Sequence, residues 1–483
     1  MKIGILTILN VNNYGAELQC CALCRKLTKM GYNAEVINYL FGINPSHDFR
    51  GEKLTVPISL KQKVKVSLLP IVQNLFCMFH QKNKKLRNKR FEEFHEKYNH
   101  LTSSVYPSVR SLYEAKFDYD VLCIGSDQVW NYEKGYSLEP FFACFDKNGT
   151  KKISYASSIG LSSLSKEAER VFKKELSGFS HLSVREQQAS ELLENLLDRD
   201  VDVVLDPTLI LDNKEWQEVA KFDMCPKEKY ILVYIVTIKP CDYVLEVARH
   251  IAKERNLKIV RICRDAYPEH SGKDVQEILT AGPSDFVGLF ANAEFVVTNS
   301  FHGTVFSINF SKSFYSVIKS QHSTNSRLTS ILKKLNLENR ILPVGSPLPK
   351  ISDVDYTIPA EKLKEERYHS IEYIKKYDDV FLTIIGGSGF SKEYVKDIDA
   401  MIDNSPYKSH IVRKGLTPFA EIKEIMQSQH FFVFPSKERC EGHSNSLNEA
   451  MAQGLVPIVS DYHFNRAIVG DDRMIVDGYD PQA

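Results

Sequence analysis

One histidine follows a stretch of sequence that is typical of a buried strand. The strand-like residues 295–297 are followed by His302 and Gly303, which stand at the start of a helix-like stretch. In open α/β sheets, ligands bind where strands end, and the N–H groups at a helix N-terminus attract anions. Histidine titrates near neutral pH and can pass a proton to a bound anion. The spacing therefore predicts a site in which His302 acts on an anionic substrate.

Two other side chains with useful chemistry also follow predicted strands. Asp127 comes after the predicted strand 121–124, and Arg185 comes after 181–184. The planar fork of arginine binds two oxygens of a carboxylate or phosphate at once, although it serves equally well in a structural ion pair. Aspartate can orient or deprotonate a hydroxyl, or it can cap a helix or turn. The sequence leaves both alternatives open for each residue.

The elements that would position these residues alternate between strand and helix. Predicted strands lie at 3–7, 34–39, 121–124, 152–155, 181–184, 201–205, 230–236, 258–262 and 295–297. This alternation predicts an α/β architecture with parallel sheets built from βαβ units. A charged helix at 359–376 closes the region, and the pattern then restarts with a strand at 380–385. We expect a domain boundary near residue 377.

The composition excludes several classes of function. The chain has 483 residues, 25% of them charged, and a formal net charge of +1, so nothing indicates a nucleic-acid partner. Ten cysteines include one Cys-x-x-Cys pair, Cys21 and Cys24, without a second pair at zinc-ligand spacing. We therefore expect no metal, and free thiols in a reducing cytoplasm.

The N-terminal third contains one feature that bears on location. Residues 1–6 read as a strand and lack the features of a signal peptide, and the apolar stretch 68–79 is too short to span a bilayer. Six basic residues follow between Lys82 and Arg90. They form either a solvated helix face or a peripheral contact with anionic or lipid-linked material. We expect a cytoplasmic protein, with peripheral contact to the inner face of the membrane as the alternative.

An ordered series of short segments runs through the first three quarters of the chain. They are Asn-Asn-Tyr-Gly-Ala at 12–16, Gly-Ser-Asp-Gln-Val-Trp-Asn at 125–131, Ser-Tyr-Ala at 154–156, Val-Arg-Glu at 184–186, Leu-Asp-Pro-Thr at 205–208, Ser-Phe-His-Gly at 300–303 and Asn-Ser-Arg at 325–327. Together they resemble the polysaccharide pyruvyl transferase family. The resemblance implies two Rossmann-like lobes facing a cleft, a GT-B-like arrangement, with lobes at 1–205 and 206–376.

The resemblance also implies a reaction. A pyruvyl (enolpyruvyl) group would pass from phosphoenolpyruvate to two hydroxyls of a sugar, forming a pyruvate ketal in a surface polysaccharide or its precursor. Phosphoenolpyruvate is the donor substrate, and no cofactor is expected. The acceptor is a sugar or glycan, free or lipid-linked.

This chemistry needs a general acid, a group that orients a hydroxyl, and cations for a carboxylate and a phosphate. The resemblance implies His302 as the acid and Arg185 as the first cation, with Asp127 as the hydroxyl partner. A helix N-terminus lowers the pKa of a histidine and a bound anion raises it, and we expect the anion to prevail. N–H groups after Gly303 would hold phosphate.

Further residues complete the predicted site. Arg261 and Arg264 are weaker candidates for the anion, and Trp130 either stacks on a sugar or belongs to the core. The expected substrate-binding residues are Asn13, Tyr14, Gly15, Ser126, Ser300, Gly303 and Arg327.

The region 378–483 carries a second set of motifs. It has Phe-Pro-Ser at 434–436, Glu441 and Glu449 eight positions apart, and Gly-Leu-Val-Pro at 454–457. These resemble the nucleotide-binding lobe of a family-4 type retaining glycosyltransferase, in which Glu449 would hold a ribose and Glu441 would lie near the donor sugar. Two solvated carboxylates are the alternative. The first strand of such a lobe is missing, so we expect a partial Rossmann-like domain with at most weak nucleotide-sugar binding.

Two other functions stay open at this point. The whole chain could be a glycosyltransferase that uses a nucleotide sugar, with residues 1–376 as an unusual acceptor lobe. It could also be a non-catalytic glycan-binding protein. The pairing of His302 with Asp127 and Arg185 favours the pyruvyl transferase over both.

Overall fold

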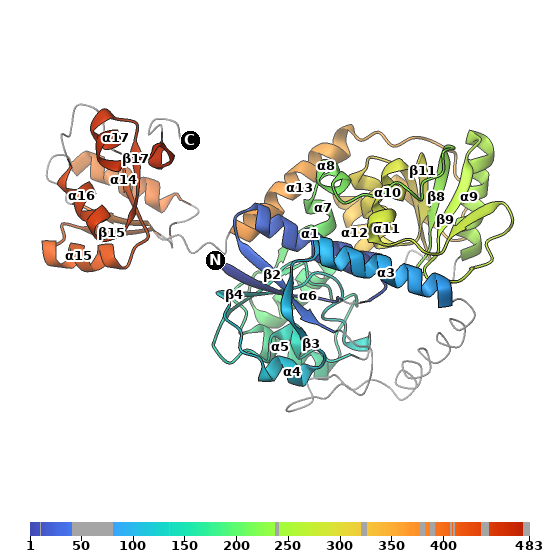
Figure 1. The fold of residues 1–483 in the computed structure, drawn as a ribbon, viewed down its shortest axis with the longest axis horizontal. Coiled ribbons are helices and arrows are strands. Elements are labelled where there is room, and N and C mark those ends of the chain that lie inside the picture. The colour runs from blue at the N-terminus through green and yellow to red at the C-terminus, as the bar shows by residue number, and fades with distance from the viewer. Residues whose placement is uncertain are drawn as a thin grey trace. The chain divides into compact units, whose positions relative to one another are not determined.

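The computed structural model describes residues 1–9, 11–40, 81–134, 136–236, 241–319, 326–375, 382–386, 392–405, 408, 411–435 and 444–476. The chain forms two compact units, Met1–Lys375 and Lys376–Ala483 (Figure 1). The predicted α/β class is confirmed, because the paired strands are parallel and alternate with helices in both units. Among the described residues, no helix is both long and apolar enough to cross a bilayer.

The first lobe of unit 1 is built on a parallel sheet of five strands. Their order is β3 (Leu101–Tyr106), β2 (Asn33–Tyr39), β1 (Lys2–Leu6), β4 (Val121–Ile124) and β5 (Lys151–Ser154). The helices of this lobe are α1 (Tyr14–Lys29), α4 (Val109–Glu114), α5 (Lys166–Leu176) and α6 (Gln187–Leu197). The strand order reverses between β1 and β4, and ligands bind outside the carboxyl ends of strands at such a switch point.

Two short strands lie beyond β5. They are β6 (Ser183–Val184) and β7 (Asp202–Val203), which pair with each other in parallel. Isolated bridges join β5 to His181 and Ser157 to Val184. The segment around β6 therefore continues the first sheet and carries Arg185 towards the same edge as the end of β4.

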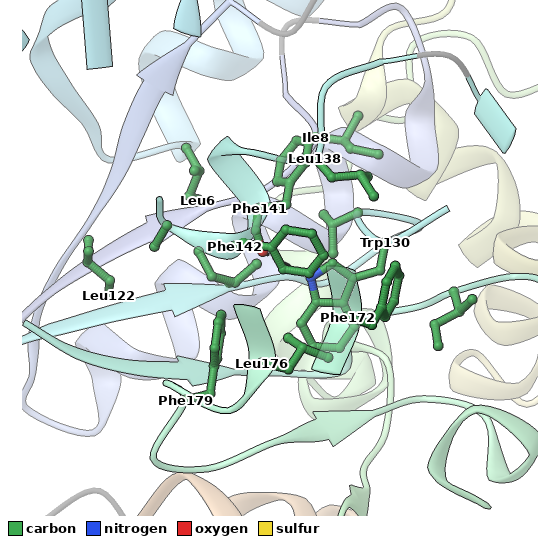
Figure 2. Packing of buried hydrophobic residues seen from close by; sticks show 14 of the residues in the cluster. Leu6, Ile8, Leu122, Trp130, Leu138, Phe141, Phe142, Phe172, Leu176 and Phe179 are labelled. Carbon is green, nitrogen blue, oxygen red and sulfur yellow. Dashed lines mark hydrogen bonds between the residues drawn. The ribbon is translucent and has the colours of Figure 1, made fainter. Parts of the chain in front are cut away.

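A large aromatic cluster forms the core of the first lobe (Figure 2). Trp130 is fully buried in it, and its indole Nε1 donates a hydrogen bond of 2.9 Å to the carbonyl oxygen of Phe141. The edge of Phe172 packs against the indole. A fully buried indole cannot stack on a sugar, so of the two alternatives for Trp130 the core role is correct.

The second lobe is a parallel sheet of six strands. Their order is β10 (Val275–Ile278), β9 (Lys258–Ile262), β8 (Tyr230–Tyr234), β11 (Phe295–Thr298), β12 (Ser313–Ile318) and β13 (Ile341–Pro343). The helices are α9 (Cys241–Arg255), α10 (Pro283–Asn292), α11 (Phe301–Asn309) and α12 (Ser326–Lys334). This is the doubly wound order, with its switch point between β8 and β11.

Two long helices tie the lobes together. Helix α3 (Gln81–Tyr98) lies across both lobes (Figure 1), and its Arg87 donates to the carbonyl oxygen of Cys263 in the second lobe. Helix α13 (Thr357–Lys375) returns to the first lobe, where the Tyr373 hydroxyl donates to the carbonyl oxygen of Ser154. The end of the segment 206–376 therefore contacts the first lobe, while Glu366 of the same helix pairs with Lys334 of α12 in the second lobe.

Unit 2 is a smaller α/β body. It has a parallel pair, β14 (Leu382–Ile385) with β15 (Ile411–Gly415), and a parallel sheet of β16 (Phe431–Phe434), β17 (Val456–Ser460) and β18 (Ile475–Val476). Its helices are α14 (Lys392–Asp403), α15 (Phe419–Gln427), α16 (Asn445–Ala452) and α17 (His463–Val469). The buried cluster of its described residues is small and centres on Met426, Ala450 and Leu455. These elements form the expected partial α/β domain.

Candidate active site

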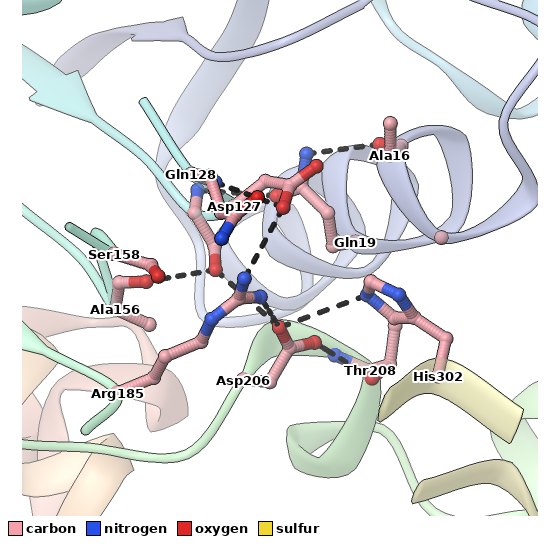
Figure 3. Close-up of polar contacts among 12 residues, drawn as sticks. Ala16, Gln19, Asp127, Gln128, Ala156, Ser158, Arg185, Asp206, Thr208 and His302 are labelled. Atoms are coloured by element: carbon pink, nitrogen blue, oxygen red, sulfur yellow. Dashed lines mark hydrogen bonds and ion pairs between the residues drawn. The ribbon is translucent and has the colours of Figure 1, made fainter. Parts of the chain in front are cut away.

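The three predicted catalytic residues lie together where the lobes of unit 1 meet (Figure 3). Asp127 follows β4, Arg185 follows β6, and His302 is the second residue of α11, which follows β11. Each residue thus stands past the carboxyl end of a strand, which is where doubly wound sheets bind ligands. Asp206, between β7 and α7 (Pro207–Ile210), joins them.

Arg185 is the centre of a buried ion-pair cluster. Its Nη1 donates to Asp206 Oδ2 at 2.6 Å, its Nη2 to Asp127 Oδ1 at 3.2 Å, and its Nε to Glu186 Oε1 at 3.4 Å. Only 1% of the Arg185 side chain is exposed. This geometry favours the structural ion pair, because the guanidinium already has three carboxylate partners. Its role as the first cation for substrate stays a prediction.

The carboxylates of this cluster differ in the direction in which their pKa is shifted. Burial opposes ionisation of Asp206 and Asp127, but the Arg185 guanidinium outweighs it, and the pKa of both carboxyls is lowered. Burial dominates at Glu186, and its pKa is raised although Arg185 opposes the change. Asp127 and Asp206 are therefore charged at neutral pH. A base with so low a pKa is better suited to orient a hydroxyl than to remove its proton.

His302 lies beside Asp206 without a hydrogen bond to it. Its Nε2 is 3.9 Å from Asp206 Oδ2 and is buried without a hydrogen-bond partner. Burial lowers the pKa of His302, although Asp206 and Asp127 act in the opposite direction. The imidazole is therefore neutral near pH 7 without substrate. A bound anion would have to raise the pKa of His302 for it to act as an acid.

Gly15 provides the space that His302 occupies. A Cβ atom on Gly15 would stand 2.0 Å from His302 Nδ1 and 2.3 Å from Cε1. Gly15 is at the start of α1, where the side chain of Asn13 accepts hydrogen bonds from the backbone N–H groups of Gly15 and Ala16. Asn13 thus caps α1. Gly15, in the first turn of that helix, packs against the His302 ring.

The structure contradicts the prediction that backbone N–H groups at the start of α11 hold phosphate. The N–H of Gly303 donates to the Ser300 hydroxyl, and the N–H of Thr304 donates to the Ser300 carbonyl oxygen. Ser300 is therefore an N-cap, and these two N–H groups are already used, so the expectation that they hold phosphate is wrong. Gly303 has a packing reason instead, since a Cβ there would stand 2.4 Å from Thr298 Oγ1.

Arg327 differs from Arg185 in that no carboxylate of the described residues lies within ion-pair distance of it. It lies in α12 over the ring of Phe301, 5.9 Å from the ring centroid, and Arg185 lies 4.9 Å from the same centroid. Within the described part of the chain, Arg327 forms no ion pair. Burial and the charge of Arg185 lower the pKa of Arg327, yet arginine stays charged. It is the predicted cation that a substrate anion would neutralise.

Two residues predicted to bind substrate are instead buried in the framework. The Tyr14 ring stacks on Phe286 at 4.7 Å, and its hydroxyl donates to the carbonyl oxygen of Ala281 in the second lobe. Ser126 is fully buried, and its hydroxyl donates to the carbonyl oxygen of Ala156. Both predictions are corrected on the same ground, because neither hydroxyl is free to contact a substrate.

The weaker arginine candidates also have partners in the protein. Arg261 is buried and forms an ion pair with Glu269, and its Nη1 donates to the Ser271 hydroxyl. Arg264 donates from Nε and Nη2 to Asp265 Oδ2 at 2.9 and 2.8 Å. Both are ion-pair residues, Arg261 within β9 and Arg264 just after it.

Asp206 is the functional candidate that the sequence analysis did not single out. Its Oδ2 accepts from Arg185, and its Oδ1 accepts from the N–H and the hydroxyl of Thr208 at 3.0 and 2.7 Å. The Asp-Pro-Thr pattern was a usable signal for a helix cap, because proline favours the first helical position. Nothing in that pattern reveals that the second carboxylate oxygen faces Arg185 and His302.

The predicted nucleotide residues of unit 2 can be placed only in part. Glu449 is exposed in α16, whose N-terminus is capped by the Ser444 side chain. Glu441 lies outside the described residues. The exposed position of Glu449 fits either of the alternatives considered for it.

Loss of the Arg185 charge should destabilise the protein. We expect Arg185→Met to lower the free energy of unfolding by about 3–5 kcal/mol, because it leaves buried carboxylates without their cation. Both tryptophans, Trp130 and Trp216, lie in unit 1, so urea unfolding followed by their fluorescence reports on this unit. As a control, Arg110→Met removes an exposed pair with Glu114 and should change the stability by at most about 0.5 kcal/mol. Equal effects of the two substitutions would contradict the buried cluster.

The fold and the site together define a class of protein. Two doubly wound lobes meet at a junction that holds a histidine, ionised aspartates and arginines, as in transferases with two facing Rossmann-like lobes. The model of the family described as polysaccharide pyruvyl transferase matches residues 13–320. The chain belongs to the polysaccharide pyruvyl transferase family. A second model, described as glycosyl transferases group 1, matches residues 359–483.

Solved structures show only distant similarity. A UDP-N-acetylglucosamine 2-epimerase from Rickettsia bellii is 10% identical, with a TM-score of 0.43 over 78% of this chain and 96% of that one. The UDP-GlcNAc 2-epimerase from Methanocaldococcus jannaschii is 13% identical, with a TM-score of 0.39 over 77% and 92%. Arabidopsis thaliana UGT89C1 complexed with UDP-L-rhamnose is 13% identical, with a TM-score of 0.38 over 83% and 97%. No curated protein matches the chain. These similarities are too low to bear on activity.

Proposed function

We propose that the chain transfers a pyruvyl group from phosphoenolpyruvate to two hydroxyls of a sugar in a surface polysaccharide or its precursor. The observation that carries the proposal is that Asp206 Oδ2 lies 2.6 Å from Arg185 and 3.9 Å from His302, while Arg327 lies at the same Phe301 ring as Arg185. Membership of the pyruvyl transferase family supports the same reaction.

The proposed reaction balances without a cofactor. A proton goes to the vinyl CH₂ of phosphoenolpyruvate, which leaves an oxocarbenium-like centre at C2. One sugar hydroxyl attacks C2, phosphate departs, and a second hydroxyl closes the ring. One hydroxyl proton replaces the proton given to the CH₂, and the other leaves with phosphate. The protein therefore has to supply the first proton and to stabilise the departing anion.

His302 supplies the proton in this proposal. The neutral imidazole takes up a proton when the anionic donor binds, because an adjacent anion raises the pKa of a histidine. Asp127 then orients the attacking hydroxyl, as its low pKa suits an acceptor of a hydrogen bond. Arg327 neutralises the carboxylate or phosphate, and Arg185 contributes charge from behind the Phe301 ring.

Binding of the donor tests this assignment before any acceptor is known. We expect phosphoenolpyruvate to bind the full chain in a calorimetric titration, and Arg327→Met to weaken it by at least about tenfold, because a hydrogen bond to a charged group contributes about 1.5–3 kcal/mol. Arg264→Met is the matched control, since Arg264 already pairs with Asp265, and its affinity should be unchanged. Binding that is equal in both variants would overturn the assignment of Arg327.

The glycosyltransferase-like match gives a second candidate function. Unit 2 would bind a nucleotide sugar through Glu449, and residues 359–483 match a glycosyl transferase model. The same titration with UDP-sugars tests it. Binding of UDP-sugars, with no response to phosphoenolpyruvate, would move the function to unit 2. A glycan-binding protein without activity would bind neither donor.

We further propose that the chain makes a peripheral contact with the anionic inner face of a membrane, where a lipid-linked acceptor would lie. In support, Lys82 and Lys85 are exposed at the start of α3. Each lysine near an anionic surface contributes about 1 kcal/mol, so Lys82→Glu with Lys85→Glu should weaken binding to vesicles with anionic lipid by at least about tenfold. The control pair, Lys166→Glu with Lys173→Glu in α5, changes the net charge equally. Equal losses, or no vesicle binding, would contradict the proposal.

A further inference from the structure

One carboxylate oxygen faces both the arginine and the histidine of the site. Asp206 Oδ2 accepts from Arg185 Nη1 at 2.6 Å and lies 3.9 Å from His302 Nε2 (Figure 3). The other oxygen, Oδ1, is held by the N–H and the hydroxyl of Thr208. Asp206 is also the N-cap of α7, followed by Pro207. The carboxylate is thus fixed from one side, and its Oδ2 is directed at the other two side chains.

The imidazole is held between this carboxylate and a glycine. Nε2 is buried without a hydrogen-bond partner on the Asp206 side. Nδ1 lies on the side of Gly15, where any Cβ would stand 2.0 Å from it. The two ring nitrogens therefore have different surroundings, and the charged oxygen on the Nε2 side favours a proton there.

We infer that Asp206 is a positioning residue, which keeps a proton on Nε2 of His302 and holds the ring when it becomes an imidazolium. The role of His302 as the acid rests on the proposed function, whereas the protonation of Nε2 does not. When the substrate anion binds, the imidazolium has two N–H groups. Nε2–H then points at Asp206, and a movement of about 1 Å brings it within hydrogen-bond distance.

Every charged group that faces the ring enters this inference. Asp206 and Asp127 favour the imidazolium, while Arg185 and Arg327 oppose it. Asp206 is the stronger of the two carboxylates in this respect, and α1 packs Gly15 against the ring. Removing the charge of Asp206 should therefore lower the pKa of His302 further. An enzyme that needs the protonated acid loses activity as pH rises through that pKa. In a variant without the Asp206 charge, activity should therefore fall at a lower pH than in the wild type.

The experiment compares the wild-type chain with Asp206→Asn. Asparagine keeps the shape of the side chain, although its single carbonyl oxygen can accept from Arg185 or from Thr208 but not from both. With ¹⁵N-histidine labelling, nitrogen–proton correlation spectra report the protonated nitrogen and the pKa of His302, which His302→Asn assigns. We expect the wild-type neutral ring to carry its proton on Nε2, and Asp206→Asn to lower the pKa of His302 by about one unit or more. A proton on Nδ1, or an unchanged pKa, would overturn the inference.

These readouts need neither substrate nor turnover. If Asp206→Asn does not fold, the tautomer of the wild-type ring still decides the matter. If phosphoenolpyruvate fails to bind, the proposed function fails while the tautomer and the pKa still test the inference. Where activity is measurable, the basic limb of the kcat profile should move to lower pH by the same amount as the pKa. A merely structural role would lower kcat without moving the limb.

Discussion

The His302→Asn variant is expected to fold normally and to lose transfer activity by about 10²–10⁴-fold, the usual contribution of a general acid. The fold should survive because His302 Nε2 makes no hydrogen bond and its ion-pair distance to Asp206 is 3.9 Å. Initial rates of phosphate release from phosphoenolpyruvate, with an accepted sugar, give the activity. Urea unfolding gives the stability.

A matched control shows whether the effect of His302→Asn is specific to His302 or follows from replacing any histidine. His369 is exposed in α13, so His369→Asn should change neither rate nor stability. Retention of more than about a tenth of the wild-type rate by His302→Asn would remove His302 as the acid, since even weak acid catalysis contributes about 10²-fold.

The Gly15→Ala variant is expected to lower kcat by about 10²-fold, the effect of misplacing a catalytic group by about 1 Å. The new methyl group would stand 2.0–2.5 Å from three atoms of the His302 ring, so the ring has to move. The phosphoenolpyruvate affinity should change much less, because Arg327 is not in contact with Gly15. A lower kcat with a nearly unchanged affinity for phosphoenolpyruvate is the result expected when only the acid is displaced.

Gly178→Ala is the control for adding a methyl group to a glycine. The nearest atom to a Cβ on Gly178 is 3.8 Å away, so this substitution should leave kcat unchanged. An unchanged kcat in Gly15→Ala as well would show that the imidazole tolerates movement, and it would contradict the arrangement in which Gly15 and Asp206 hold the ring between them.

The sequence predicted the architecture better than the contacts. Buried strands such as 230–236 and 295–297 are continuous apolar runs, which is the pattern of parallel sheets. The strands β3 and β12 were not predicted, because Leu101–Tyr106 and Ser313–Ile318 mix serine with apolar residues and resemble loops. The position of His302 past a strand end followed from the same pattern.

The roles within the site could be predicted only in part. The motif order placed Asp127, Arg185 and His302 in one site, but it could not tell a substrate contact from a structural one. Tyr14 and Ser126 stand beside predicted site residues in the sequence, yet their hydroxyls donate to backbone carbonyls of distant segments. Asp206 reads as an ordinary helix cap. Its second oxygen acquires a role only when the fold brings β6 and α11 to the same place.

A transfer reaction in D₂O tests most directly whether His302 gives its proton to phosphoenolpyruvate. Phosphoenolpyruvate and a panel of sugars with 4,6-diols or vicinal diols are incubated with the full chain, and the ketal methyl group is observed by NMR. We expect the wild-type chain to form a pyruvate ketal whose methyl group carries one deuterium. The His302→Asn variant should not form it. A ketal methyl group without deuterium, or equal ketal formation by His302→Asn, would contradict proton transfer from His302 to phosphoenolpyruvate.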